Sequence, residues 1–558
     1  MVSVYILASA SLSRDLDVSW KDIKSGVSNL VLEFLSPNIM SVFEGYLTLI
    51  AIFTASCAAI IWTRSSHLHS LHVPPGPPLA GWLSGHVAIL PLTKPWKVYT
   101  EWAHKYGSLL HIRAFNQRII LLSSMEDCIE LFERRSSLYS DRPTLPISDL
   151  MGWDFNAGLM SYGPRWRRQR RLFQQMFRKA TSLAYRPEQT RKVNDMLYGL
   201  LASPEDFRDH VQTLSAAVVM STTYGYDIQP KKDHYVEIAE EAALRLATAA
   251  VPGAAMVNHV PILRYLPTWF PGAVFHKLAA ETKVLTTQMK EIPFKWTQEK
   301  MKAGTAVDCI VAAKLPSCRT QQDVIELQEF AAMTYAAGAD TTTAGLNTFF
   351  YIMAAVSPDV QRKAQQEIDR VVGRNRLPTY DDWDSLPYTE AIMREVLRWR
   401  PILPLGFPHR VIDDDIYKGY LIPKGSLIMA NTWALSRDPS IYKDPEAFNP
   451  DRFFDKDGNL NDDDSSYTFG FGRRKCPGQH MANATMWLSM VTTLWAFDIG
   501  KAKDASGQEI PIAGEYSDGM ISHVQSHECS ITPRSSQVER IIKEAAAQTR
   551  ERSSHHEY

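Results

Sequence analysis

A glycine-rich loop carrying one cysteine constrains this chain more than any other stretch. Residues 469–478 read Phe-Gly-Phe-Gly-Arg-Arg-Lys-Cys-Pro-Gly and run into an apolar helical pattern from Met481 to Trp495. The glycines allow the backbone to fold tightly around the sulfur of Cys476. Proline has no N–H, so the donors come from Gly478 onward, and together with the start of the following helix they favour a deprotonated sulfur. The loop therefore predicts a held thiolate.

The fixed positions of this loop identify a family resemblance. Its residues follow the spacing Phe-x-x-Gly-x-Arg-x-Cys-x-Gly, at Phe469, Gly472, Arg474, Cys476 and Gly478. This spacing resembles the haem-binding loop of the cytochromes P-450, the haem-thiolate monooxygenases. The resemblance implies that Cys476 is the axial ligand of the iron of haem b, with the rest of the loop binding the cofactor, and that the thiolate favours O–O cleavage. The alternative is a buried structural cysteine after a glycine turn.

Length and composition bound the possibilities further. The chain has 558 residues, 45% of them hydrophobic, enough for one large domain or two ordinary ones. A net charge of −1 argues against a nucleic-acid binder. The six cysteines are scattered without a C-x-x-C pair, which speaks against a zinc site and against a disulfide scaffold. A reducing compartment fits this pattern.

An uncharged run near the N-terminus predicts a membrane anchor. Residues 45–63 carry no charge between Glu44 and Arg64, and nineteen residues of helix reach about 28 Å. We expect a luminal leader at 1–43, a single transmembrane helix at 44–64, and the large domain on the cytosolic side. The resemblance suggests the endoplasmic reticulum membrane. The alternatives are a buried helix of a soluble core and, for residues 1–40, a mis-predicted gene start.

The remainder of the chain predicts a mainly α fold with small β-sheets. A proline-rich hinge at 65–78 precedes a haem-thiolate monooxygenase domain at 79–533 and a polar tail at 534–558 that is expected to fray. Residues 108–123 predict a hairpin around Asn116, and strand signals return near 410–430 and 510–532. Helical spacing covers 164–180, 190–203, 206–224, 233–250, 276–303, 323–356, 358–372 and 388–400. As the resemblance implies, this is the cytochrome P-450 fold, a single large domain behind one N-terminal transmembrane helix.

A basic helix start carries two candidate cofactor ligands. Trp166 and Arg170 lie at i and i+4 and share one helical face. In the family, a tryptophan and an arginine at this spacing reach the haem propionates, for which a guanidinium is well shaped. The alternative is a solvated basic helix face. The other basic residues nearby are candidates for a docking patch for an acidic reductase: Arg165, Arg167, Arg168, Arg171, Arg473 and Lys475.

The helix 323–356 contains a polar notch. Residues 337–342 read Ala-Gly-Ala-Asp-Thr-Thr, which resembles the family motif on its long central helix. Gly338 allows close packing, at a cost of about 1 kcal/mol relative to alanine. The resemblance assigns proton handling to Asp340 and Thr341. The alternative is that the threonines hydrogen-bond to helix carbonyls.

Two further segments match the family. Glu395 and Arg398 lie three apart on one helical face, and with Arg452 they resemble the Glu-Arg-Arg triad that locks the haem side of the core. His409, in Pro-Leu-Gly-Phe-Pro-His-Arg, matches a propionate contact, although a lone histidine is more often a satisfied core residue.

We therefore predict a monooxygenase that inserts one atom of dioxygen into a hydrophobic small molecule. The resemblance, which looks fungal, implies an NADPH-dependent reductase as partner, with a small haem electron donor as an option. The expected pocket walls are the 141–160 loop, the 235–300 helices, the central helix, residues 402–408 and the 515–522 turn; they suit terpenoids, steroids, polycyclic aromatics or xenobiotics. The alternatives are a reductase-independent isomerase or dehydratase, and a non-catalytic membrane haem protein.

Overall fold

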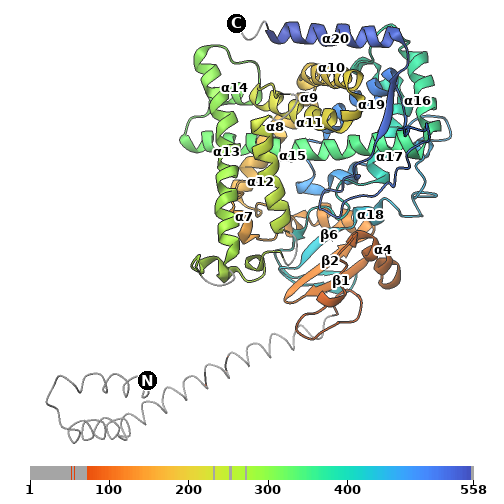
Figure 1. The fold of residues 1–558 in the computed structure, drawn as a ribbon. Coiled ribbons are helices and arrows are strands. Elements are labelled where there is room, and N and C mark those ends of the chain that lie inside the picture. Colours follow the sequence, from red (N-terminus) through yellow and green to blue (C-terminus); the bar gives the residue numbers. More distant parts are fainter. Residues whose placement is uncertain are drawn as a thin grey trace, which may run out of the picture. The chain divides into compact units, whose positions relative to one another are not determined.

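The computed structural model describes residues 72–229, 233–250, 254–269 and 273–554, together with Ile52 and Ser56 (Figure 1). The chain divides into two compact units. One comprises Met1–Val73 with Lys418–Leu421, and the other Pro74–Tyr417 with Ile422–Tyr558. In the first unit, the amide of Leu421 donates a hydrogen bond to the carbonyl of His72 over 2.9 Å. Every candidate site residue belongs to the second unit.

The predicted leader, the predicted anchor and the start of the hinge lie outside the described residues, apart from Ile52 and Ser56. In the part of the chain that is described, no helix is both long and apolar enough to cross a bilayer. The transmembrane segment therefore stays a prediction.

Helices make up most of the second unit, and the eight helical segments expected from periodicity are present. The helices are α4 (Pro95–Tyr106), α5 (Met125–Cys128), α6 (Ser136–Tyr139), α7 (Pro146–Leu150), α8 (Pro164–Phe177), α9 (Lys179–Ser182), α10 (Arg186–Ala202), α11 (Phe207–Tyr224), α12 (His234–Ala250), α13 (Val274–Ala303), α14 (Ile310–Lys314), α15 (Gln321–Tyr351), α16 (Pro358–Val371), α17 (Pro387–Trp399), α18 (Thr432–Leu435), α19 (Gln479–Ala496) and α20 (Ser536–Ser554).

The long helix α15 runs through the middle of the helical part (Figure 1). It begins at a capping box, in which the Thr320 side chain accepts from the amide of Asp323 over 3.1 Å and the Asp323 carboxylate accepts from the amide of Thr320 over 2.9 Å. In α15 the flanking stretches 327–335 and 342–350 are mostly buried, whereas the stretch 336–341 is at least partly accessible. The polar notch therefore lies between two buried stretches of the helix.

The strands form small sheets, as expected. β1 (Leu109–Ala114) and β2 (Gln117–Leu122) are the predicted hairpin, and β6 (Leu427–Ala430) pairs parallel to β2 and antiparallel to β3 (His409–Arg410). Within this sheet the strand order is β1-β2-β6-β3. The other strands are β4 (Asp415–Tyr417), β5 (Tyr420–Ile422), β7 (Phe497–Lys501) and β8 (Cys529–Pro533), of which β7 and β8 pair antiparallel. Strand β7 and helix α4 were not predicted.

The prediction of a frayed polar tail was wrong. Helix α20 covers Ser536–Ser554 and packs against α10. Val538, Ile542 and Ala546 recur every four residues and are buried, so they form a narrow apolar stripe on one face. The many charged and polar residues keep the average hydrophobicity of the segment low. Three buried apolar residues are nevertheless enough to dock one face of a helix. The domain therefore continues past residue 533.

Candidate active site

The cysteine loop is shaped by its glycines. The amide of Cys476 donates to the carbonyl of Phe469 over 2.8 Å and closes the loop just before α19. Gly472 has φ = 53°, and a Cβ at this position would lie 2.1 Å from the carbonyl oxygen of Phe132. Any side chain there would collide with backbone, so the loop requires glycine at this position.

The sulfur of Cys476 is accessible, although protein surrounds it closely enough to affect its ionisation. Burial raises the pKa of the Cys476 thiol, while the backbone N–H groups of Gly478 and Gln479 and the charge of Arg170 act to lower it. The predicted donors are present, but they do not outweigh burial. The loop therefore supplies the expected groups that favour a thiolate, and a cation bound to the sulfur would favour the thiolate further.

Arg474 and Trp166 form a stacked pair. The guanidinium of Arg474 lies 4.1 Å from the ring centre of Trp166 and donates to the carbonyls of Ser140 (2.8 Å), Ala157 (3.1 Å) and Met160 (2.8 Å). Burial lowers the pKa of Arg474 to about 9. The loop that carries Cys476 is thereby fixed to α8 and to the 140–160 segment.

Arg170 is the cation that acts on the cysteine. It lies one helical turn after Trp166, and its charge lowers the pKa of the Cys476 thiol. Burial lowers the pKa of the Arg170 guanidinium itself. Among the described residues, no carboxylate forms an ion pair with Arg170. A partly buried cation without an anionic partner favours an anionic ligand.

His409 uses its neutral form. Its Nδ1 lies 2.7 Å from the carbonyl oxygen of Tyr139, which can only accept a hydrogen bond, so Nδ1 carries the hydrogen and donates it. Burial lowers the pKa of His409 well below its usual value, and Arg142 adds to this effect. In this state Nε2 is an acceptor. His409 would hold a propionate by hydrogen bonding only as an imidazolium, which a nearby anion favours.

Two contributors to this region were missed by sequence reasoning. Phe132 lies between the cysteine loop and His409, with its ring centre 6.0 Å from that of Phe471 and 4.2 Å from that of His409. Arg142 is buried and donates to the carbonyls of Gly158 (2.8 Å), Phe407 (3.1 Å) and Pro408 (2.7 Å). Neither stands out by motif: Arg142 lies in the 141–160 segment, which carried only a general expectation of a pocket wall, and Phe132 lies outside every segment singled out from the sequence.

The donor set fits a haem. Arg142, Arg170 and Arg474 are three cations that, among the described residues, make no ion pair with a carboxylate, and the carboxylate of Asp141 is engaged by Arg410. Excess buried positive charge is unfavourable unless an anionic ligand compensates for it. Two propionates would supply that charge, and the accessible sulfur of Cys476 would meet the iron.

The notch on α15 is polar and accessible. Thr341 Oγ1 donates to the carbonyl of Ala337 over 2.9 Å, so the threonine does hydrogen-bond to its own helix while its hydroxyl keeps lone pairs free. Asp340 is exposed, and His523 Nε2 lies 3.3 Å from its carboxylate. Further along α15, a Cβ on Gly345 would lie 2.8 Å from the terminal methyl of Met486, which places α15 directly against α19.

The structure brings Glu395, Arg398 and Arg452 together. Arg398 binds Glu395 through two hydrogen bonds of 2.6 and 2.8 Å, and both side chains are fully buried. Arg452 adds a third contact to Glu395 over 3.1 Å. Arg398 also donates to the carbonyls of Ser436 and Pro445, and Arg452 to that of Lys443. The buried charges are thus paired and hydrogen-bonded, as buried ions must be.

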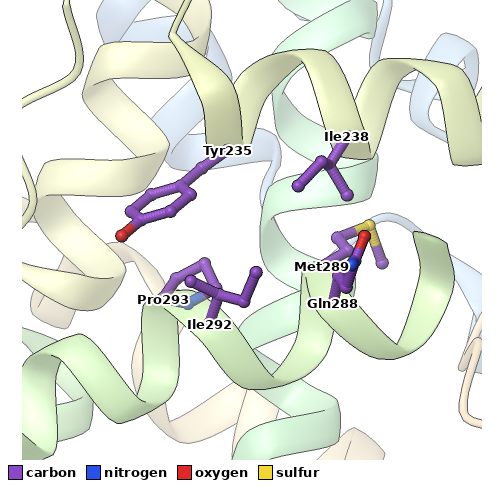
Figure 2. A pocket seen from close by; sticks show the side chains of 6 residues that line it. All are labelled: Tyr235, Ile238, Gln288, Met289, Ile292 and Pro293. Atoms are coloured by element: carbon purple, nitrogen blue, oxygen red, sulfur yellow. The ribbon is translucent and has the colours of Figure 1, made fainter. Parts of the chain in front are cut away.

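A small hollow of about 140 Å³ lies between α12 and α13 (Figure 2). Its lining residues are Tyr235, Ile238, Gln288, Met289, Ile292 and Pro293. None of the candidate cofactor or proton-handling residues contributes to it, so it is not the reaction site.

Comparison with known proteins covers nearly the whole chain. The profile described as Cytochrome P450 matches residues 74–513. Cytochrome P450 monooxygenase claR of Ampulloclitocybe clavipes is 37% identical over 515 residues, which is 91% of this chain and 94% of the relative. Cytochrome P450 monooxygenase 208 of Postia placenta is 39% identical over 486 residues, 86% and 94% of the two chains. Cytochrome P450 monooxygenase ple1 of Rhodocybe pseudopiperita is 38% identical over 509 residues, 90% and 97%.

Proposed function

We propose a specific reaction for this chain, which belongs to the cytochrome P450 family and is a P450 monooxygenase. A hydrophobic small molecule, dioxygen, NADPH and a proton give the hydroxylated product, water and NADP⁺, with the electrons passing through a reductase. The observation that carries the proposal is the accessible Cys476 beside Arg170, in a region where Arg142, Arg170 and Arg474 form no ion pair with any described carboxylate. The candidate substrates are secondary metabolites such as terpenoids, steroids or polycyclic aromatics, or xenobiotics.

The haem would be held by residues from three parts of the chain. Cys476 would supply the thiolate ligand of the iron, and Phe469 and Gly478 would hold the loop around it. The propionates would be met by Trp166, Arg170, His409 and Arg474, to which we add Arg142. When bound, haem b supplies the redox chemistry that activates dioxygen. Glu395, Arg398 and Arg452 keep the surrounding core in place.

Asp340 and Thr341 would handle protons. The proposed reaction puts one oxygen atom into the substrate and reduces the other to water, which requires protons at the reaction site. The hydroxyl of Thr341 keeps two acceptor lone pairs beside the accessible notch, where it can hold a water molecule. Asp340 is exposed one residue earlier and can exchange protons with solvent.

A cationic face supports docking of an acidic reductase. Arg167, Arg171 and Arg473 are exposed, and the guanidiniums of Arg167 and Arg473 lie 5.7 and 5.5 Å from the ring centre of Tyr162. This shared ring joins α8 to the cysteine loop. Two other members of the predicted patch are engaged within the chain, because Arg165 pairs with Asp154 and Glu329 and Arg168 pairs with Glu326.

We also propose that the protein is held at the endoplasmic reticulum membrane, with its catalytic domain in the cytosol. Two segments present large exposed apolar side chains: Leu79, Trp82, Leu83 and Leu92 in one, and Ile262, Tyr265, Trp269 and Val274 in the other. Clustered exposed apolar groups support contact with a membrane. The uncharged run 45–63 would supply the single-pass anchor.

The cofactor assignment is tested by Cys476→Ala. We expect the variant to lose the red-shifted Soret band of the ferrous carbon monoxide complex, because thiolate donation to the iron gives rise to it. Cys318→Ser, which changes a half-buried cysteine that follows α14, should keep that band. Retention of the band in Cys476→Ala would overturn the assignment. Turnover of substrate without NADPH would instead favour an isomerase or dehydratase.

A further inference from the structure

A turn near the C-terminus reaches back to the central helix. We call residues 515–525, between β7 and β8, the strap. The amide of Gln525 donates to the carbonyl of Glu515 over 2.8 Å, and the amide of Ser517 donates to the carbonyl of His523 over 2.8 Å. The strap is therefore a closed turn with internal hydrogen bonds.

The backbone of His523 is fixed by hydrogen bonds that do not involve its imidazole. Its carbonyl accepts from Ser517, and its amide donates to the Ser517 hydroxyl over 3.0 Å. The neighbouring amide of Ser522 donates to the carbonyl of Ile402 over 2.8 Å. Both backbone groups of His523 are thus engaged, so the imidazole approaches α15 from a fixed point.

The imidazole meets the carboxylate of Asp340. His523 Nε2 lies 3.3 Å from each carboxylate oxygen, and the His523 and Asp340 side chains are 29% and 55% exposed. In the described part of the chain, no other side chain donates a hydrogen bond to Asp340. A carboxylate this exposed adopts several rotamers unless a partner selects one.

The carboxylate of Glu240 also influences which rotamer Asp340 adopts. Glu240 on α12 is close enough to Asp340 for the two charges to repel: burial is the larger cause of the raised pKa of Glu240, and Asp340 adds to it. Gln212 on α11 donates to Glu240. Repulsion from Glu240 pushes the Asp340 carboxylate away, whereas the N–H of His523 attracts it.

We propose that His523 is the positioning residue for Asp340, holding its carboxylate in the rotamer that delivers protons toward Thr341. The proposal rests on the function proposed above for Asp340. It makes the strap part of the proton-delivery machinery as well as a wall of the pocket. What His523 supplies is a hydrogen-bond donor at a fixed point, so glutamine, whose amide also donates, should replace it in part.

The first test measures turnover with NADPH and a reductase in four variants. We expect His523→Ala to lower the rate about tenfold, with little change in KM. Complete loss of a positioned proton donor costs roughly a hundredfold or more, so the effect of His523→Ala should be the smaller one. His523→Gln should recover most of the rate. Because His523 acts through Asp340, adding His523→Ala to Asp340→Asn should slow that variant no further. Equal rates for the alanine and glutamine variants, or additive losses, would overturn the proposal.

The second test needs no turnover. We expect amide hydrogen exchange in the strap, followed by mass spectrometry, to be several-fold faster in His523→Ala and in Asp340→Ala than in the parent. Asp340→Asn should keep the slow exchange, because its amide oxygen still accepts. Unchanged exchange in both alanine variants would refute the contact. If the parent shows no NADPH-dependent turnover, the proposed function fails, while this measurement still judges the contact.

Lys94→Ala is the matched control. The Lys94 side chain pairs with Glu515 at the start of the strap and does not touch Asp340, so Lys94→Ala removes this ion pair while the Lys94 backbone amide still donates to Asp518. Exchange should quicken near residue 515, while turnover stays at the parent level. A rate loss equal to that of His523→Ala would show that general loosening of the strap is the cause, and would overturn the specific role of His523.

Discussion

Val219 on α11 fills the space beside Gly338 on α15. A Cβ on Gly338 would lie 2.8 Å from a methyl group of Val219, closer than side chains normally approach. The glycine of the notch motif therefore serves the packing of α11 on α15. This relationship also explains why a residue unfavourable to helices is tolerated in the middle of a buried helix.

Gly338→Ala should destabilise the enzyme. Crowding in a packed core costs about 1–3 kcal/mol, and the better helix propensity of alanine returns about 1 kcal/mol. We expect a net loss of about 1 kcal/mol, seen as a Tm lower by about 2 °C. In a Val219→Ala background, Gly338→Ala should be harmless, because the clashing methyl is gone. Equal losses from Gly338→Ala with and without Val219 would show that the contact is not the cause.

Glu395→Gln should be severely destabilising. It leaves the fully buried guanidinium of Arg398 without its counter-charge, which costs roughly 3–5 kcal/mol. We expect little folded, haem-containing protein, measured as Soret absorbance per unit of protein. Glu390→Gln, one turn earlier and partly exposed, removes a pairing with Arg394 and should cost far less. Comparable haem content in both variants would contradict the locking role of the triad.

Thr341→Ala should uncouple electron flow from product formation. Without the hydroxyl, the water that carries protons is no longer held, so more dioxygen is released as hydrogen peroxide while NADPH use persists. Asp340→Asn should instead slow the whole cycle. The measurement is product formed per NADPH consumed in both variants and the parent. An unchanged ratio in Thr341→Ala would reduce Thr341 to the helix hydrogen bond with Ala337.

Charge reversal at Arg167 and Lys475 should slow reductase-driven turnover by about tenfold while leaving peroxide-driven turnover nearly intact. The difference should shrink at high salt, where steering is screened. The same charge change at Lys295 and Lys302, exposed on α13, is the control. Equal slowing with both electron sources would mean that the patch supports the structure and not electron delivery.

His111 on β1 should make the fold sensitive to acid. Burial is the main cause that lowers its pKa from 6.5 to about 4, with Arg118 also contributing. The unfolded chain therefore binds a proton between pH 6.5 and 4 that the folded chain does not, so stability is complete above pH 6.5 and falls by up to about 3 kcal/mol toward pH 4.

His111→Phe should flatten the dependence of Tm on pH across this window. The change also removes the buried Nε2 of His111, which has no hydrogen-bond partner. His104→Gln, at an exposed position on α4, should leave the acid limb of the curve as it is in the parent. An acid limb as steep in His111→Phe as in the parent would assign the effect to other groups.

Sequence pattern predicted the elements whose signals are local. The helices α10 to α13 and α15 to α17 follow from residues three and four apart, and the β1–β2 hairpin follows from two apolar runs around a short turn. The signal failed for α20, because its apolar stripe is sparse. It also failed for β7, because the chain changes from helix to strand at Phe497 without a turn residue.

The sequence by itself determined the turn of the cysteine loop, since the positive φ angles of Gly470 and Gly472 and the spacing to Cys476 are local, whereas the close approach of Phe132 to Gly472 is tertiary. Tertiary structure alone decided which cations gather at that loop and which partner holds Asp340. Arg142 lies 332 positions before Arg474 in the numbering, and His523 lies 183 positions after Asp340. Contacts over such separations depend on how buried helices pack, which no local periodicity encodes. The same holds for the pKa of Cys476, because burial, a property of the whole fold, outweighs the donors that its own loop supplies.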